Sequence, residues 1–477
     1  MKEKIYNLAF DFGASGGRLM MGAFDGERVE LTELHRFPNE PVQVNGRLMW
    51  DVLRLFHEMK EGMKKAAALH LPFEGIGIDT WGVDYGLLDA GGNLIGAPIN
   101  YRDARTEGIM DEVAKIVPLA EIYRSTGIQF MPFNTIFQLY ADRKMRPAAY
   151  DNAETLLFMP DLFAYFLTGK KICEYTNAST SQLLDVAKRD WDKDLAKRIG
   201  LRTDMLQELT EPGTMIGTLT AEVQQETGLG AVPVIAVGSH DTASAVAGTP
   251  FEDSRGAAFL SSGTWSLLGV ERDAPIVTDE AFESNFTNEG GVENTIRFLK
   301  NINGLWILQQ LRKSWNATQK ANLGFGDIVA AARNAKNKNL IINPSNPIFL
   351  APPNMVGTIT HYCERDQGTP MGIGELAMAV YNGLAREYRA HVDTLARLVK
   401  HPIPRINMIG GGTQDALLCE MTAYETGREV CAGPIEGSVL GNILMQWKAG
   451  GHISGLAEGR AVIKRSFEQK IYKASGQ

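Results

Sequence analysis

The sequence has few cysteines and no long uncharged apolar run, and each absence excludes a class of protein. Its four cysteines, at positions 173, 363, 419 and 431, lie far apart and form no Cys-x-x-Cys pair. Neither a disulfide framework nor a structural zinc site is indicated, so we expect reduced thiols in a cytoplasmic protein. No apolar run approaches the roughly 18 residues that span a bilayer. The first residues lead directly into an expected strand, so no signal peptide is expected either.

An excess of positive charge is also lacking. The 48 lysines and arginines stand against 56 aspartates and glutamates, which gives a net charge of −8. This balance argues against nucleic acid or an anionic membrane as the main partner, whereas small anions can still bind to backbone N–H groups. The composition is 44% hydrophobic and 22% charged, as in folded globular proteins, and 477 residues exceed what one core usually covers. We therefore expect two domains.

Two common nucleotide-binding motifs are missing as well. The sequence contains no Gly-x-x-x-x-Gly-Lys-Ser/Thr, which leaves a Walker-type site unsupported. A partial match to Gly-x-Gly-x-x-Gly, at Gly75 and Gly77, lies inside an expected strand and has no third glycine. A dinucleotide-binding fold is therefore unsupported too.

What the sequence does contain is an antiparallel meander at the start of each half, with a first turn of Gly, Ser, Thr or Ala. The segments expected as strands are 6–12, 18–24, 29–34, 74–79, 85–89, 232–237, 257–260, 265–270 and 406–409. Helices are expected over most of 118–166, 304–315 and 374–399. Residues 247–253 combine Gly and Pro without a hydrophobic period, which is typical of a hinge. This pattern predicts an α/β protein with an N-terminal domain over 1–248 and a C-terminal domain over 249–477.

The first turn, 13–17, is rich in small residues and suits an anion. Its backbone N–H groups can converge on a phosphate, with a hydroxyl from Ser15 and positive charge from Arg18. Asp11 would then face the phosphate, which requires a divalent cation between them. The alternative is a plain glycine-rich hairpin with a surface arginine.

Two further turns have the same character. Residues 261–264 read Ser-Ser-Gly-Thr, and residues 410–412 are three glycines between an expected strand and helix. Taken alone, residues 261–264 are better explained as an ordinary Ser/Gly turn, and residues 410–412 equally well by the steric requirement of a strand–helix turn. Three such turns together with strand-end aspartates favour a nucleotide bound in a cleft between two similar domains.

The loop after the strand 74–79 carries groups that suit a polyhydroxylated ligand. Asp79 and Asp84 can accept hydroxyl hydrogen bonds, Trp81 can cover an apolar face, and Gly82 leaves room. The alternative is an Asp-capped turn with a core tryptophan. His240 is either a ligand contact or a small buried polar group, and no His/Cys cluster near it suggests a metal.

Asp241 is the residue on which we expect catalysis to depend. It follows the expected strand 232–237 and opens a run of small residues that can start a helix. Open α/β sheets place reacting groups at such strand ends. As a general base it must be ionised, which an ordinary pKa of about 4 would allow.

With these motifs, the sequence resembles the FGGY carbohydrate kinases, relatives of glycerol kinase and xylulokinase in the sugar kinase/Hsp70/actin superfamily. The resemblance implies two ribonuclease H-like domains with a cleft between them. Its GASGGR, DTWGVDY and HDTASAV forms point to the branch that acts on rhamnulose rather than on xylulose or glycerol. The matching stretches are AFDFGASGGR (9–18), GIDTWGVDYGLLD (77–89), VGSHDTASAV (237–246), FLSSGTWSLLG (259–269), NFTNEGG (285–291), LKNINGLW (299–306) and IGGGTQDALL (409–418).

The resemblance also implies roles for single residues. Asp241 would be the catalytic base, and Asp11 would help to place Mg²⁺ through water. The ATP-binding residues would be Ala14, Ser15, Gly16, Gly17, Arg18, Thr264, Gln309, Gly410, Gly411 and Gly412. The sugar-binding residues would be Gly82, His240, Asp241, Thr242 and Asn301, to which the chemistry of their loop adds Asp79 and Trp81.

The sequence departs from the family pattern at two positions. Gly16 stands where a second hydroxyl residue is usual, so one side-chain contact to phosphate is lost while the backbone contacts remain. Gln138 stands where the central signature of the family often has lysine. We draw no substrate preference from the second difference.

The implied reaction is ATP-dependent phosphorylation of L-rhamnulose at its 1-hydroxyl, as part of L-rhamnose catabolism. Mg²⁺ is the implied cofactor, ATP and the sugar are the only implied partners, and a monomer or small homo-oligomer is expected. One alternative is a kinase for another ketose, L-fuculose or xylulose, because such sugars differ by only a methyl group or one hydroxyl configuration. The other is a non-catalytic sugar sensor that keeps the fold.

Overall fold

The computed structural model describes residues 4–253, 256–350 and 352–474. Within these residues, no helix is both long enough and apolar enough to cross a membrane. The four cysteines are free and buried.

Contacts divide the chain into two compact units. Unit 1 consists of Met1–Pro250, Glu271–Phe298 and Gly437–Phe467, and unit 2 of Phe251–Val270, Leu299–Glu436 and Glu468–Gln477. The sequence-based division at 248 differs from these units, because two later segments pack with the N-terminal part of the chain.

Unit 1 is built on a six-stranded sheet with the order β13-β14-β6-β1-β2-β3. Its strands are β1 (Ile5–Phe12), β2 (Gly16–Phe24), β3 (Val29–Pro38), β6 (Phe73–Asp79), β13 (Met215–Thr218) and β14 (Pro233–Ile235). The first three strands form the expected antiparallel meander, and β6 and β14 extend the sheet in parallel. The strand expected over 232–237 is real but shorter, because the chain leaves the ladder after Ile235.

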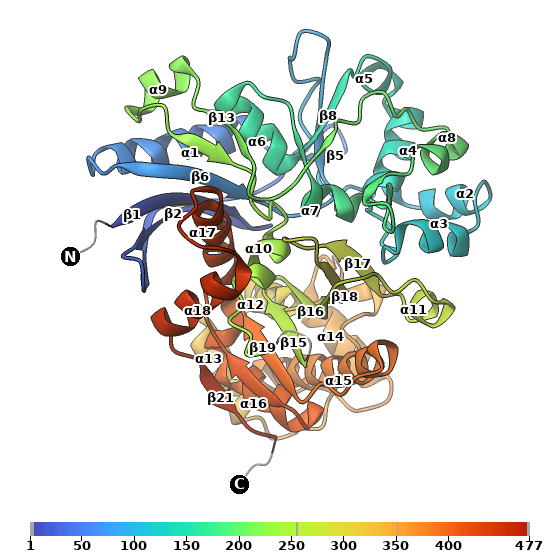
Figure 1. Ribbon diagram of the computed structural model, residues 1–477. Helices are drawn as coiled ribbons and strands as arrows, with labels where there is room; N and C mark the ends of the chain where they lie inside the picture. Colours follow the sequence, from blue (N-terminus) through green and yellow to red (C-terminus); the bar gives the residue numbers. More distant parts are fainter. Residues whose placement is uncertain (1–3, 254–255, 351, 475–477) are drawn as a thin grey trace. The chain divides into compact units, whose positions relative to one another are not determined.

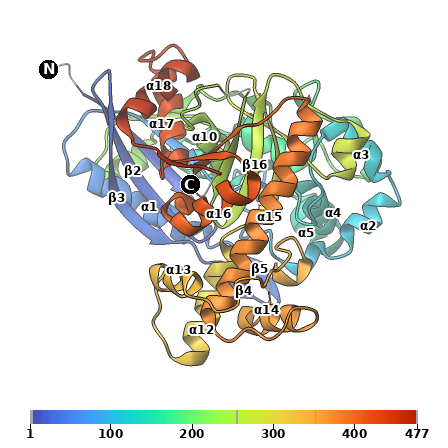
Figure 2. The same cartoon turned by 90° about the horizontal axis from the view of Figure 1, so that it is seen from below.

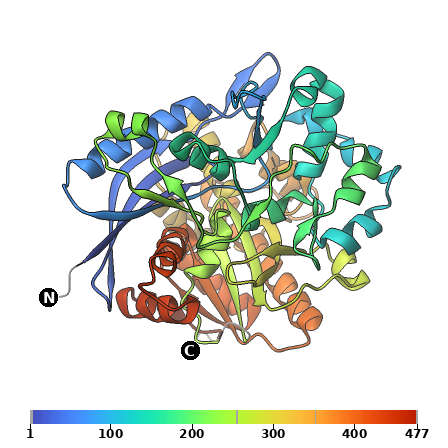
Figure 3. The ribbon, with the colours of Figure 1, turned by 45° about the horizontal axis from the view of Figure 1, so that its top comes forward.

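Different helices cover the two faces of this sheet, because side chains alternate along a strand. Leu8, Phe10 and Phe12 of β1 join a core with α1 (Val52–Ala67) and α6 (Met159–Thr168), whereas Ala9 joins a core with α17 (Gly437–Ala449). Helix α10 (Asp241–Ala247) packs against α17, as Figure 1 shows. Figure 3 shows α1 (blue) beside α9 (Ala221–Thr227, green), although more than 150 residues separate them in the sequence.

A second core of unit 1 forms from the region between β6 and β13. Its helices are α2 (Ile109–Ala114), α3 (Leu119–Thr126), α4 (Thr135–Met145), α5 (Pro147–Asp151), α7 (Tyr175–Ala178) and α8 (Lys193–Ile199). The strand expected over 85–89 is β7 (Tyr85–Leu88), which pairs with β8 (Thr155–Phe158). The expected helical region 118–166 therefore contains one strand, whose four residues are all buried.

The remaining elements of unit 1 include three pairs of short strands. Paired strands are β4 (Val42–Val44) with β5 (Arg47–Met49), β9 (Cys173–Glu174) with β12 (Leu209–Thr210), and β10 (Leu184–Asp185) with β11 (Asp190–Trp191). The later segments supply α11 (Asp279–Glu283), β17 (Thr287–Gly290), the first residues of β18 (Ile296–Asn303) and α18 (Leu456–Ser466).

Unit 2 contains a run of strands in the order β16-β15-β19-β20-β21. They are β15 (Ala257–Ser262), β16 (Trp265–Arg272), β19 (Arg405–Ile409), β20 (Glu429–Ala432) and β21 (Lys470–Tyr472). Its helices are α12 (Trp306–Gln319), α13 (Phe325–Arg333), α14 (Met355–Glu364), α15 (Ile373–Val399) and α16 (Ala416–Thr426). Helix α15, predicted from its apolar spacing, contacts both α13 and α16 (Figure 2).

Candidate active site

Asp241 is the first residue of α10 and lies beside the end of β6. The backbone N–H of Asp241 donates to the carbonyl of Thr80 at 2.8 Å, and the N–H of Thr80 donates to the carbonyl of Ser239 at 2.9 Å. Thr80 follows β6 directly, so these bonds tie the end of β6 to the start of α10. The predicted helix start after the glycine- and serine-rich run is confirmed.

The Asp241 carboxylate is partly open to solvent, with 34% of its side chain exposed. Its Oδ1 accepts a hydrogen bond from Thr242 Oγ1 at 3.1 Å and lies 3.4 Å from His240 Nε2. Burial raises the pKa of Asp241, His240 lowers it, and the nearby Asp11 carboxylate raises it further. The expectation of an ordinary pKa is therefore wrong, because the sequence shows neither the burial nor the second carboxylate.

Asp11 is the last residue but one of β1, and two side chains hold its carboxylate. Arg18 donates to Asp11 Oδ2 from Nη2 at 2.7 Å and from Nε at 3.0 Å, and Ser438 Oγ donates to the same oxygen at 3.0 Å. The expected phosphate-turn arginine is thus also the ion-pair partner of Asp11.

The first small-residue turn connects β1 to β2 and is tied inward by its carbonyls. Gly13 and Ser15 accept bonds from Asn39, at 2.9 Å and 3.2 Å, and Gly16 accepts one from the N–H of Gly13 at 2.8 Å. With Ser15 exposed and its neighbours partly exposed, the turn is open to a ligand on its outer side.

The aromatic loop lies partly inside unit 1. Asp79 is completely buried and accepts a 2.6 Å bond from Asn442, and burial together with Asp11 raises its pKa well above the usual value. Trp81 is 5% exposed and donates from Nε1 to Asp84 at 3.1 Å. In this structure, Asp79 offers no surface to a ligand and Trp81 very little.

Gly82 is the loop residue that faces the His240 side chain. A Cβ atom at Gly82 would lie 3.0 Å from Thr180 Oγ1 and 3.3 Å from His240 Nε2. Either contact is tighter than ordinary packing, so a side chain here would occupy the space beside His240. Gly82, His240, Asp241 and Thr242, four of the predicted sugar residues, are thus brought together.

The sequence did not reveal Glu174, which holds the segment before Asp241 in place. Glu174 is 1% exposed, and it accepts bonds from the hydroxyl of Ser239 and from Thr176 Oγ1 at 2.6 Å. It also accepts backbone bonds from Thr176, Asn177 and Ser239. Glu174 thus connects α7 to the segment before Asp241. Nothing in the sequence around Glu174 distinguishes it from a surface glutamate.

In unit 2, the structure brings the other two turns together. A Cβ atom on Gly412 would lie 2.1 Å from Ser262 Oγ, and one on Gly410 would lie 2.9 Å from the carbonyl oxygen of Ser262. Gly410 also has φ of +84°, which favours glycine. The triple-glycine turn after β19 therefore packs directly on the turn between β15 and β16.

The turn between β15 and β16 is also hydrogen-bonded to the start of α12. Leu305 and Trp306 donate backbone bonds to the carbonyls of Gly263 and Thr264, at 3.0 Å and 3.1 Å. Gln309 lies in the first turn of α12, which begins at Trp306. Asn301 lies on β18 and is half-buried. Unit 2 also has an open cavity of about 340 Å³, lined by Arg333, Lys338, Met378, Asn382, Leu417 and Met421.

The chain matches both domain models of one protein family. The N-terminal domain model of the FGGY family of carbohydrate kinases matches residues 6–248, and the C-terminal domain model matches residues 258–450. The chain belongs to the FGGY family of carbohydrate kinases. It is therefore a carbohydrate kinase with ATP as its co-substrate, and the sequence-based resemblance is confirmed.

Relatives of this FGGY kinase match over nearly its whole length. A rhamnulokinase from Bacteroides thetaiotaomicron is 41% identical over 99% of this chain and 96% of the relative. A rhamnulokinase from Halalkalibacterium halodurans is 41% identical over 98% of each.

Solved structures confirm the fold. A gluconate kinase from Lactobacillus acidophilus superimposes with a TM-score of 0.81 at 18% identity, covering 99% of this chain and 94% of that one. A glycerol kinase from Plasmodium falciparum, solved with ADP, gives a TM-score of 0.77 at 16% identity, with 99% and 95% covered. The predicted α/β fold with two sheet-based domains is confirmed.

Proposed function

We propose that this kinase transfers the γ-phosphoryl group of ATP to the 1-hydroxyl of L-rhamnulose, which yields L-rhamnulose 1-phosphate and ADP in L-rhamnose catabolism. The observation that carries the sugar assignment is the identity of about 40% with rhamnulokinases over nearly the full chain. The Asp241 carboxylate, one-third exposed beside His240 and Gly82, supports the reaction type.

Asp241 acts as the general base. As the sugar oxygen bonds to the γ-phosphorus, the bond from that phosphorus to the ADP oxygen breaks, and Asp241 takes the hydroxyl proton. Thr242 Oγ1 and His240 Nε2 both lie against Oδ1, so they leave Oδ2 to accept this proton. The transition state of phosphoryl transfer is loose, so most of the remaining catalysis is positioning and charge neutralisation.

The raised pKa of Asp241 predicts where activity is lost on the acid side. A base works only when ionised, so kcat/KM for the sugar falls as pH drops through the raised pKa and is full above it. We expect this limb at a higher pH than the value of about 4 of an ordinary aspartate. The measurement is a pH profile at saturating ATP. ATP itself titrates in assays of both the wild type and Asp241→Asn. If the acid limb of the profile is still present in the residual activity of Asp241→Asn, it belongs to a group other than Asp241.

We assign the nucleotide to the three small-residue turns. The turn of Ala14 to Arg18 and the turn at Thr264 would hold the phosphates, and Gln309 and the Gly410–Gly412 turn would contact the rest of ATP. The packing of the glycine turn on Ser262 supports a common role of these two turns. The apolar side chains of Met378, Leu417 and Met421 give the 340 Å³ cavity the character that a purine base needs.

The sugar would be held by Gly82, His240, Thr242 and Asn301. Trp81 and Asp79 support this region from within unit 1, since their exposed fractions are 5% and 0%. Asp79 would act through Asn442 and through its charge interaction with Asp11.

The side chains around Asp11 fit a hydrated Mg²⁺ bound through water. Asp11, Asp79 and Asp241 interact electrostatically, which is the oxygen-rich environment that Mg²⁺ prefers. Among the described residues, no group of three or more His, Cys, Asp or Glu is arranged to hold a metal directly. When bound, the ion would neutralise the phosphate charge that Asp11 would otherwise repel.

A panel of ketoses tests the sugar assignment. L-rhamnulose, L-fuculose and xylulose are assayed with MgATP and coupled detection of ADP. We expect kcat/KM to be at least about 10-fold higher for L-rhamnulose, since one methyl group or hydroxyl in a pocket is worth roughly 1–3 kcal/mol. Equal or higher turnover of another ketose would assign that sugar instead. Sugar binding without ADP formation would identify a sensor.

A further inference from the structure

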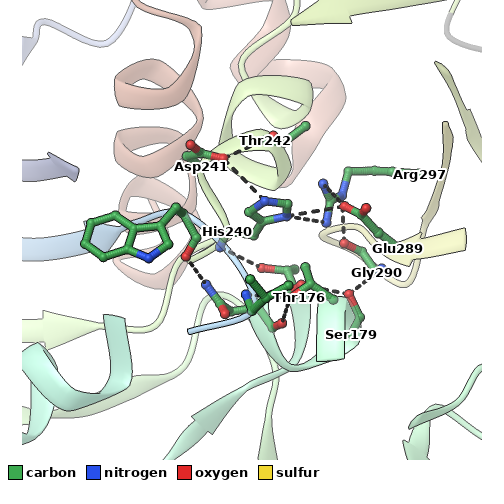
Figure 4. Close-up of polar contacts among 12 residues, drawn as sticks. Thr176, Ser179, His240, Asp241, Thr242, Glu289, Gly290 and Arg297 are labelled. Atoms are coloured by element: carbon green, nitrogen blue, oxygen red, sulfur yellow. Dashed lines mark hydrogen bonds and ion pairs between the residues drawn. The ribbon is translucent and has the colours of Figure 1, made fainter. Parts of the chain in front are cut away.

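Behind His240 lies a buried ion pair that the proposed chemistry does not use. Arg297 on β18 is 0% exposed, and its Nη1 lies 3.1 Å from Oε2 of Glu289 on β17, which is 4% exposed. Arg297 Nη2 also lies 3.2 Å from Nδ1 of His240, within hydrogen-bonding geometry. Figure 4 shows the guanidinium of Arg297 and the carboxylate of Glu289 on the side of the imidazole opposite Asp241.

Arg297 has little freedom to move away from His240. Its Nε donates to the carbonyl of Gly290 at 2.8 Å, and the N–H of Gly290 donates to Ser179 Oγ at 2.7 Å. A Cβ atom at Gly290 would lie 2.3 Å from the ring of Tyr175, so this strand packs tightly on α7. Because these contacts are buried, water does not replace them readily.

The chemistry of the contact determines which nitrogen of His240 carries the proton. A guanidinium has only donors, and a neutral imidazole has one donor and one acceptor nitrogen. Nδ1 must therefore accept from Arg297, which leaves the proton on Nε2. Glu289 Oε2, at 3.4 Å from Nδ1, would favour the opposite tautomer. It lies closer to Arg297, at 3.1 Å, and the guanidinium neutralises its charge.

We propose that Arg297 is a positioning residue that holds His240 as the Nε2–H tautomer and aims this N–H at Asp241 and the sugar. In this tautomer, Nε2 donates toward Asp241 Oδ1 at 3.4 Å and toward the space beside Gly82. In the other tautomer, a lone pair on Nε2 would face the carboxylate and repel it. The catalytic part of this inference rests on the proposed sugar kinase function, and the tautomer itself does not.

The wild-type enzyme tests the tautomer directly. In protein labelled with ¹⁵N-histidine, long-range proton–nitrogen correlation spectra distinguish a protonated from an unprotonated ring nitrogen, and His240→Gln identifies the signals of His240 among the eight histidines. We expect Nε2 protonated and Nδ1 unprotonated at neutral pH. A protonated Nδ1 overturns the proposal, because Glu289 would then be the partner that orients His240.

Substitution of Arg297 tests the catalytic consequence. Arg297→Met should lower kcat by about 10- to 100-fold, by analogy with loss of the hydrogen-bond partner that orients a metal-binding histidine, and should abolish the single tautomer in the spectrum. Arg297→Lys keeps a cationic donor and should recover part of both. KM for ATP should not change. An unchanged kcat and tautomer in folded Arg297→Lys and Arg297→Met overturns the proposal.

A matched control separates positioning from a general loss of stability. Arg460 on α18 also forms a buried pair, with Glu271, through two bonds of 2.9 Å. It also donates to the carbonyls of Val246 and Ala247, at the opposite end of α10 from Asp241. Arg460→Met should therefore destabilise unit 1 and leave the His240 tautomer intact. If the ketose panel fails but the tautomer is as expected, the sugar assignment falls and the role of Arg297 remains. If L-rhamnulose is the preferred ketose but the tautomer is not as expected, the role of Arg297 falls and the sugar assignment remains.

Discussion

Replacing Asp241 by asparagine is expected to lower kcat by roughly 10²–10⁴-fold, the range for loss of a general base. Asparagine keeps the shape of the side chain, and its Oδ1 can still accept the bond from Thr242 at 3.1 Å. What it cannot do is take the proton of the sugar hydroxyl. KM for ATP should change little, because no predicted ATP contact is altered. The measurement is steady-state kinetics with coupled detection of ADP.

The stability of the Asp241→Asn enzyme should not fall, because a carboxyl with a raised pKa is replaced by a neutral group. A thermal unfolding curve checks this point. Asp111→Asn, at an exposed aspartate of α2, serves as the control for purification and assay and should retain full kcat. A near-normal kcat in Asp241→Asn would remove the base assignment.

Replacing Gly441 by alanine is expected to cause a large loss of stability. Helices α10 and α17 approach so closely that a Cβ atom at Gly441 would lie 1.8 Å from the carbonyl oxygen of Ser244 and 2.9 Å from the backbone nitrogen of Gly248. Neither backbone atom can turn aside as a flexible side chain does. The helices must separate, so we expect Gly441→Ala to lose about 3 kcal/mol or more of unfolding free energy, the upper end of the overpacking range.

Gly441→Ala should also reduce activity in the fraction that folds. Helix α10 begins at Asp241, so a displaced α10 moves the carboxylate relative to the substrate, and a misplacement of 1 Å can cost about 100-fold in rate. Stability is measured by the midpoint of thermal and denaturant unfolding, and activity by kcat.

Gly326 in α13 provides the matched control, because a Cβ atom there meets nothing within 4 Å. Gly326→Ala should raise stability by about 0.5–1 kcal/mol, through the helix propensity of alanine. If Gly441→Ala is as stable as Gly326→Ala, the close approach of α10 and α17 does not exclude a side chain at position 441.

The sequence was sufficient for elements that depend on local pattern. The meander over residues 5–38 and the long helix α15 follow from alternation and from apolar spacing, and the structure has both. The pattern was insufficient where a strand is paired with a distant segment. Residues 155–158 form β8 because Tyr85–Leu88 of β7 pair with them, and no local signal separates that segment from the helices around it.

In the candidate site, the residues could be predicted from local sequence, but their chemical states could not. Asp241, His240, Thr242 and Gly82 were recognised from short stretches of sequence, and the structure places them together. Their chemical states were not predictable, because these depend on partners far away in the sequence. Arg297 reaches His240 across 57 positions, and Asn442 reaches Asp79 across 363.

By itself, the sequence determined the family, the three small-residue turns and the aspartate at the start of a helix, because each is a local motif of a few adjacent residues. Only the tertiary structure decided that Asp241 has a raised pKa, that Arg18 is paired with Asp11, that Asp79 is buried and that His240 is backed by Arg297. The physical reason is that charge state and hydrogen-bond direction depend on burial and on the nearest charges. Both are set by contacts between segments that folding brings together.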